Sequence, residues 1–185
     1  MPILGVIASS TRQGQSTDAS AMYALGMVQV GAGGATYLTF TGIPATYKHL
    51  QLRLLTTAPD GSTEGYVEYN ADYTASNYRW HRFFGNGSAT ASGSGADSYI
   101  FNGWQVGLAG SFVTSIIDIV DYASTSKLKT TRCLTGFETN GGANSSWIAN
   151  NSTLWNNTAA ISQIRVRMST GNFGQYTQAT LYGIK

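Results

Sequence analysis

The sequence has little charge for its length. Asp, Glu, Lys and Arg make up 11% of its 185 residues, against roughly 25% in an average soluble domain. The formal net charge is +2, so the chain lacks the strong positive field that favours binding to nucleic acids or acidic membrane surfaces. This composition is also unlike that of coiled coils, helical bundles and acidic tails. We therefore expect neither nucleic acid nor membrane among the partners.

Cysteine and long hydrophobic runs are scarce as well. Cys133 is the one cysteine, and a lone thiol forms neither an intramolecular disulfide nor a thiolate metal site. We interpret it as a buried or half-buried strand residue. The apolar runs are too short for a transmembrane helix. His49 and His81 have no ligand spacing around them, so we expect no metal and no cofactor.

Small polar residues take the place of the missing charge. Gly, Thr, Ser and Asn together contribute 74 of the 185 residues, while hydrophobic residues reach 42% and aromatic residues 12%. A disordered chain would be poorer in aromatic residues and richer in charge. The sequence therefore predicts a folded domain whose surface is wetted mainly by hydroxyl and amide groups.

Alternation of apolar and polar residues predicts strands throughout residues 26–185. Residues 49–54 place three leucines on one face, residues 164–168 alternate in the same way, and residues 111–122 and 127–137 form a natural hairpin. Residues 85–98, rich in Gly and Ser, are interpreted as a loop. We predict about nine or ten strands in an all-β, antiparallel β-sandwich of jelly-roll-like type. A closed barrel is the alternative.

Residues 1–25 differ from the rest and are predicted to form an extended N-terminal arm. An apolar tip is followed by a polar linker at residues 9–18. Such a tip either packs back on its own domain or docks on a neighbouring subunit or protein, and we favour docking. The side chains expected to anchor it are Ile3, Leu4, Val6 and Ile7.

The acidic residues do not form a catalytic pair. Asp118 and Asp121 are three residues apart in a predicted strand and therefore point to opposite faces. An acid at an inner face or a sheet edge needs a cationic partner. The arginines considered for this role are Arg132, Arg165 and Arg167.

No nucleophile or phosphate-binding motif accompanies these acids. The sequence contains no G-x-S-x-G elbow and no glycine-rich run that ends in Gly-Lys-Ser/Thr. Glu64 and Glu68 share one face of a short strand, which we interpret as solvated. We therefore expect no catalytic residue and no enzymatic activity.

Aromatic residues offer the most specific contact candidates. They cluster at residues 73–84, and two tryptophans flank an Asn-rich stretch further along. Core or subunit packing is the interpretation that we favour, and stacking on the sugar rings of a glycan is the alternative. The candidates for subunit or glycan contact are Tyr78, Trp80, Phe83, Trp147 and Trp155.

Several longer stretches carry a resemblance to known proteins. They are residues 40–53 (FTGIPATYKHLQLR), 76–87 (SNYRWHRFFGNG), 115–123 (SIIDIVDYA) with 127–130, and 155–165 (WNNTAAISQIR) continuing to 185. As a set, they resemble small jelly-roll-like structural proteins of tailed bacteriophages, including cyanophages. The resemblance covers residues 26–185 and leaves the arm outside it.

The resemblance implies a structural protein of the virion with no activity to transfer. One expectation is a capsid decoration (cement) protein on the outer surface of the phage head, a homotrimer that contacts the major capsid protein. The other is a tail-fibre or receptor-binding module that contacts host-surface glycans. Both imply assembly in the host cytoplasm.

Overall fold

The computed structural model describes residues 21–59, 63–106, 111–138 and 146–185. In these ranges the chain is all β, with twelve strands and no helix. The first six strands are β1 (Met22–Gln29), β2 (Tyr37–Phe40), β3 (His49–Thr56), β4 (Thr63–Tyr69), β5 (Tyr78–Gly85) and β6 (Thr90–Asp97). The others are β7 (Ile100–Val106), β8 (Val113–Ile119), β9 (Lys129–Phe137), β10 (Trp147–Trp155), β11 (Ile164–Met168) and β12 (Gln178–Ile184). No helix of membrane-spanning length and apolarity occurs in the described ranges.

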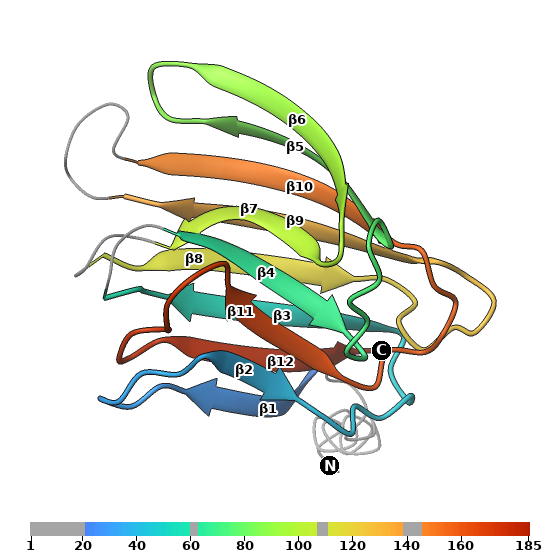
Figure 1. Cartoon of the computed structure of the whole chain (residues 1–185). Coiled ribbons are helices and arrows are strands. Elements are labelled where there is room, and N and C mark those ends of the chain that lie inside the picture. Colours follow the sequence, from blue (N-terminus) through green and yellow to red (C-terminus); the bar gives the residue numbers. More distant parts are fainter. Residues whose placement is uncertain (1–20, 60–62, 107–110, 139–145) are drawn as a thin grey trace, which may run out of the picture.

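The strands form two antiparallel sheets that stack face to face (Figure 1). The large sheet has eight strands in the order β1-β12-β3-β8-β9-β10-β5-β6, and the small sheet has four in the order β2-β11-β4-β7. The predicted antiparallel, jelly-roll-like β-sandwich is therefore confirmed. Two sheets allow every strand to bury one apolar face, which an isolated hairpin cannot do.

Alternating side chains from both sheets fill the space between them. In β3 the residues Leu50, Leu52 and Leu54 are buried, as the pattern of residues 49–54 predicts. Each fully buried leucine stabilises the fold by about 1.5–3 kcal/mol relative to an exposed one. Ile117 and Ile119 of the neighbouring strand β8 extend this core layer. The residues that face it from the small sheet include Val67 and Tyr69 of β4 and Ile164 and Val166 of β11.

Twelve strands exceed the nine or ten that the sequence predicts, and β6 is one cause. Its residues 90–97 lie within the stretch interpreted as a loop, yet they pair with β5 over all eight positions. At the other edge, β1 begins at Met22, inside the segment assigned to the arm. The anchor residues Ile3, Leu4, Val6 and Ile7 lie outside the described residues.

The large sheet extends beyond the small one at its β5–β6 end. In Figure 1, β6 lies beyond the strands of the small sheet. The nearest small-sheet strand is β7, which contacts β10, β9 and β5. Within the described residues, the small sheet has no strand opposite β6. We call the adjoining part of the inner face, which carries Trp80, Phe84 and Trp147, the overhang.

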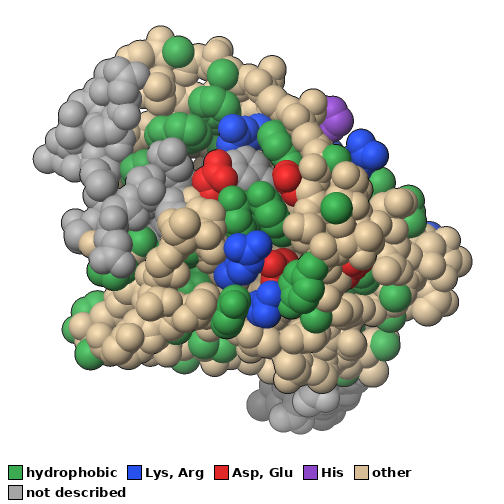
Figure 2. Space-filling view, viewed as in Figure 1, with side chains coloured by type: hydrophobic (Ala, Val, Ile, Leu, Met, Phe, Trp, Pro, Cys, Tyr) green, Lys and Arg blue, Asp and Glu red, His purple; other side chains and the backbone are tan. Residues whose placement is uncertain are grey.

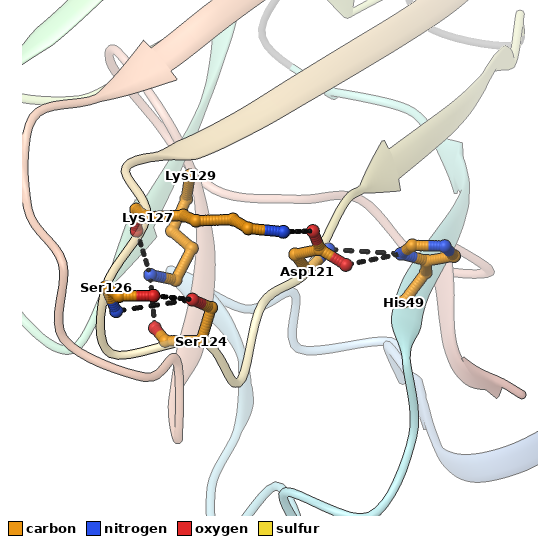
Figure 3. A network of polar contacts seen from close by, with 6 residues as sticks. All are labelled: His49, Asp121, Ser124, Ser126, Lys127 and Lys129. Atoms are coloured by element: carbon orange, nitrogen blue, oxygen red, sulfur yellow. Dashed lines mark hydrogen bonds and ion pairs between the residues drawn. The ribbon is translucent and has the colours of Figure 1, made fainter.

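The predicted β8–β9 hairpin is confirmed, and polar contacts hold its turn (Figure 3). Asp121 adopts a positive φ of 48°, and its carboxylate accepts a hydrogen bond of 2.7 Å from the Lys127 ammonium. Lys129 is fully buried, and its Nζ donates to the carbonyl oxygens of Ser124, Lys127 and Thr158 at 2.7–3.0 Å. Burial lowers the pKa of Lys129. Three carbonyl acceptors satisfy this buried cation without a carboxylate.

Candidate interaction surface

Two of the five aromatic candidates lie in the core. Tyr78 and Trp155 are 0% and 1% exposed, their rings stack with centroids 6.3 Å apart, and Trp155 also meets Tyr69 edge-on. Residues buried to this extent do not reach a ligand on the surface of a single chain. The core-packing interpretation therefore describes both side chains.

The core pair is tied to the loop between β4 and β5. The indole Nε1 of Trp155 donates to the Asp72 carboxylate at 2.7 Å, and Asn77 donates to the same oxygen. Partial burial alone would raise the pKa of the Asp72 carboxyl, but hydrogen bonds from Thr74, Trp155 and Asn77 outweigh it and lower the pKa to about 2. Asp72 thus holds the β4–β5 loop, which connects the two sheets, against the Trp155 side chain.

Two further candidates, Trp80 and Trp147, lie half-buried on the overhang. The Trp147 ring stacks on Phe84 at 4.6 Å, and the Arg82 guanidinium lies over Trp80 and Phe84 at 5.5 and 5.1 Å. The Trp80 indole donates to Asp97 at 2.6 Å. These rings form a partly accessible aromatic group on the inner face.

Phe83 is exposed on the opposite, outer face of the large sheet, where other apolar side chains join it. We call these residues the apolar strip; its members and their exposed fractions are Phe83 (64%), Ile148 (62%), Leu134 (50%) and Ile116 (41%). They come from four neighbouring strands, β5, β10, β9 and β8. An antiparallel sheet with one solvated face normally places polar residues there, so four clustered apolar side chains mark a surface suited to a partner.

Strand register explains why the strip is continuous. Leu134 lies directly opposite Ile116 in the β8–β9 pair, and Asn150 lies opposite both Leu134 and Phe83. Gly136 lies opposite Ile148 and leaves a hollow lined by Thr114, Ile116, Leu134 and Ile148 among others. A second, more polar hollow beside Phe83 is lined by His81, Ser92, Arg132, Asn150 and Ser152 among others. An apolar centre with a polar margin is the usual anatomy of a protein interface.

Of this strip, only Phe83 is among the contact candidates predicted from the sequence. A signal for two others is present: Ile116 is followed by Ile117, and Leu134 follows Cys133. Successive strand residues point to opposite faces, so adjacent apolar residues indicate a strand that is apolar on both. In each pair the partner is buried in the core, and the strip residue takes the outer face.

The outer face of the small sheet is closed by an ion-pair network. Glu68 was interpreted as solvated, and this is wrong because its side chain is 1% exposed. Its two carboxylate oxygens accept from Arg165 at 2.7 Å and Arg167 at 2.6 Å. Both arginines lie on β11, the neighbour of β4, and cover the carboxylate. The network offers no free carboxylate for chemistry.

Tyrosine rings flank the two arginines. Arg165 lies over the rings of Tyr37 and Tyr73 at 4.4 and 4.9 Å, and Arg167 lies over Tyr66 at 4.7 Å. Figure 2 looks onto this side of the molecule and shows basic, acidic and hydrophobic side chains gathered in the middle of the face. Cation–π contacts of this kind stabilise by about 0.5–2 kcal/mol each.

The two aspartates singled out in the sequence do not meet. Asp118 lies in β8 and accepts a hydrogen bond from Gln51 at 2.8 Å, while Asp121 lies beyond the end of β8 and pairs with Lys127. Asp118 faces Arg132 in the strand register. The suggested pairing with Arg165 or Arg167 is wrong, because both arginines bind Glu68 instead.

The thiol and the metal-ligating side chains add no further site. Cys133 is buried, as predicted, and burial raises its pKa to about 12, which makes the thiol unreactive at neutral pH. In the part of the chain that the structure describes, no group of three or more His, Cys, Asp or Glu residues is arranged to hold a metal ion. Among the described residues, the apolar strip is therefore the candidate functional surface.

Comparison with known proteins does not identify the chain. No protein-family model matches it, and no curated protein matches it significantly.

Proposed function

We propose that this chain is a non-enzymatic structural protein of a tailed-phage virion, and that it acts as a capsid decoration protein. Its apolar strip docks on the major capsid protein, and copies on the outer surface of the head bridge capsid subunits. The observation that carries the proposal is the strip itself: four apolar side chains, 41–64% exposed, on neighbouring strands of a sheet face.

The size of the strip suits a contact that is repeated many times. Burying about 300 Å² of apolar surface stabilises an interface by about 7.5 kcal/mol at 25 cal/mol per Å². Losses of rotational and translational freedom offset part of this gain. A moderate affinity at each site is sufficient when many copies reinforce one shell. The predicted arm residues Ile3, Leu4, Val6 and Ile7 would add apolar area to each contact.

The surface chemistry supports the same role. With 11% charged residues and abundant Ser, Thr, Asn and Gly, the chain carries little charge that would repel neighbouring copies on a crowded shell. The two sheets also share one apolar core, which suits a domain that acts through shape and adhesion.

The test is a binding assay on virus particles stripped of this protein. The double variant Leu134→Asp/Ile148→Asp places two charges in the strip, and the control Thr130→Asp places one at an exposed outer position of the same strand, β9. We expect the double variant to bind particles at least about tenfold more weakly, because a charge in an apolar contact must be desolvated. The control should bind as the wild type does.

Two results would overturn the proposal. One is normal decoration by a double variant whose unfolding curve shows that it is folded. The other is an antibody-labelled image of wild-type virus in which the protein is absent from the particle.

One observation favours the second candidate, a tail-fibre or receptor-binding module for host-surface glycans. The half-buried rings of Trp80, Phe84 and Trp147 lie on the overhang with Arg82 among them, and aromatic faces stack on sugar rings. The same antibody-labelled image separates the candidates, because label on the tail favours this module and label on the head favours decoration.

A further inference from the structure

The two edge strands of the large sheet, β1 and β6, differ in how well they are protected from pairing with another strand. At one edge, β1 contains a bulge between Ala24 and Gly26, where its register with β12 shifts. At the other edge, β6 pairs with β5 over eight consecutive positions without any shift. Bulges twist an edge away from incoming strands, so β1 is protected in a way that β6 is not.

The composition of β6 also leaves its outer edge open. The strand reads Thr-Ala-Ser-Gly-Ser-Gly-Ala-Asp and contains no proline, lysine or arginine. Its one charged residue, Asp97, stands at the end and accepts a hydrogen bond from Trp80. Within the described ranges, no strand pairs with the free edge of β6. A long, regular edge strand whose single charge lies at its end is a template for pairing with another strand.

The Trp80 ring packs against the inner face of β6. A Cβ placed on Gly95 would come within 2.7 Å of the Trp80 ring, and one on Gly93 within 3.6 Å. The ring thus lies directly against the backbone of β6 and supports it in an extended form. An ordered edge loses less conformational entropy on pairing than a mobile segment does.

We propose that β6 pairs antiparallel with β6 of a second copy of this chain, around a two-fold axis perpendicular to the sheet. The two eight-stranded sheets then continue into one another. Closed two-fold contacts use the same patch on both copies, so the strand must be complementary to itself. This inference does not depend on the proposed capsid role.

The sequence of β6 meets this condition. Its outer-face residues are Thr90, Ser92, Ser94 and Ala96, because they lie opposite the outer-face positions of β5. A two-fold axis through Gly93 or through Ser94 keeps outer residues opposite outer residues. In both registers Asp97 lies opposite an alanine rather than a second Asp97, so no like charges meet across the seam.

The charges of β5 do not oppose the pairing either. Arg79 and Arg82 lie on β5, and β5 of one copy is separated from β5 of the other by three strand spacings, or about 14 Å. This distance exceeds the Debye length of about 8 Å at physiological salt. The two apolar strips end on the same side of the continuous sheet, each beginning at Phe83, one strand from the seam.

The first test measures the mass of the full-length chain by analytical ultracentrifugation. The variant Ser92→Lys/Ser94→Lys places lysines opposite one another across the seam. We expect its dimer dissociation constant to rise at least about tenfold, because directly opposed like charges destabilise strand pairs. The matched control, Met27→Lys/Gln29→Lys, carries the same charges at exposed positions of the other edge strand, β1, and should dimerise as the wild type does.

Cysteine cross-linking determines the register in which β6 pairs with β6 of the second copy. Ser94→Cys alone should form a disulfide-linked dimer if the axis passes through Ser94, and a mixture of Ser92→Cys and Ser94→Cys should do so if it passes through Gly93. The native thiol of Cys133 is buried, so cross-links report the introduced residues.

Four outcomes would overturn the proposal. The wild-type chain could remain monomeric at about 100 µM, above the concentration at which a specific dimer should form. It could form a trimer, as the phage resemblance implies. The lysine pair on β1 could disrupt association as strongly as the pair on β6. Finally, the lysine pair on β6 could leave the dimer intact while deletion of residues 1–12 abolishes it, which would identify arm exchange.

Discussion

The outer faces of the two sheets arise from the same alternating pattern but differ in what they expose. On the small sheet, the outward positions of β4 and β11 carry Glu68, Arg165 and Arg167, which form ion pairs and cover the shared carboxylate. On the large sheet, the outward positions of β9 and β10 carry Leu134 and Ile148, which are 50% and 62% exposed. The small-sheet face is completed by its own side chains, whereas the large-sheet face has apolar area left to bury.

This difference separates residues that hold the fold together from residues available to a partner. Removing a member of the Glu68 network leaves a buried charge without its partner, which destabilises the folded state. Removing a residue of the apolar strip changes little in the isolated chain, because its surface already contacts water. Substitutions in the Glu68 network should therefore lower stability. Substitutions in the apolar strip should weaken binding and leave stability almost unchanged.

The largest expected effect is on the small-sheet face. Glu68→Gln removes the carboxylate that Arg165 and Arg167 share while their side chains are only 24% exposed. We expect the free energy of unfolding to fall by about 3 kcal/mol, measured by urea titration followed through tryptophan fluorescence. Glu138→Gln, an exposed carboxylate just beyond β9, is the matched control. A fall in the free energy of unfolding of less than about 1 kcal/mol would show that the ion pairs do not stabilise this face.

A smaller effect is expected at Asp72, in the loop that joins the sheets. Its folded pKa of about 2 lies below the usual 3.8, so its contribution to stability is present above about pH 4 and is lost as the pH falls toward 2. Asp72→Asn should lower the free energy of unfolding by about 1–2 kcal/mol at pH 7, and the difference should shrink as the pH falls through about 2. Unfolding curves across this range measure the difference. A constant difference would contradict the assignment of the hydrogen bonds to the ionised carboxylate.

The smallest effect on stability is expected in the apolar strip. Leu134→Ser should change the free energy of unfolding by no more than about 0.5 kcal/mol, because an exposed side chain contributes little to the core. Leu52→Ala is the comparison, since this leucine is 0% exposed and should cost about 2–5 kcal/mol. Thermal and urea unfolding provide both values. A cost above about 1.5 kcal/mol for Leu134→Ser would mean that the strip belongs to the core and not to a docking surface.

Strands with strong local alternation could be predicted from the sequence, and the Gly- and Ser-rich strand could not. In residues 49–54 and 164–168 the side-chain period of two is unmistakable, and both segments are strands with one buried face. The composition of β6 resembles a loop, since Gly and Ser have low β propensity. It becomes a strand because β5 supplies a full set of backbone partners and Trp80 covers its glycines.

The candidate surface was predicted only in part. Phe83 was named from its place in an aromatic segment, but Tyr78 and Trp155, named by the same reasoning, are buried. An aromatic side chain on a strand packs equally well in a core and at an interface. The sheet order decides between them, since it determines which face of β5 and β10 meets the small sheet.

By itself the sequence determined the class of the molecule: strand periodicity, turn chemistry and low charge lead to an antiparallel sandwich with a polar, uncharged surface. Only the tertiary structure decided that Glu68 is buried, that four apolar residues remain outside, and that β6 ends the sheet. The physical reason is distance along the chain, since the Arg165–Glu68 pair joins residues 97 positions apart. Local patterns give the face on which a side chain lies, and strand pairing decides what it meets there.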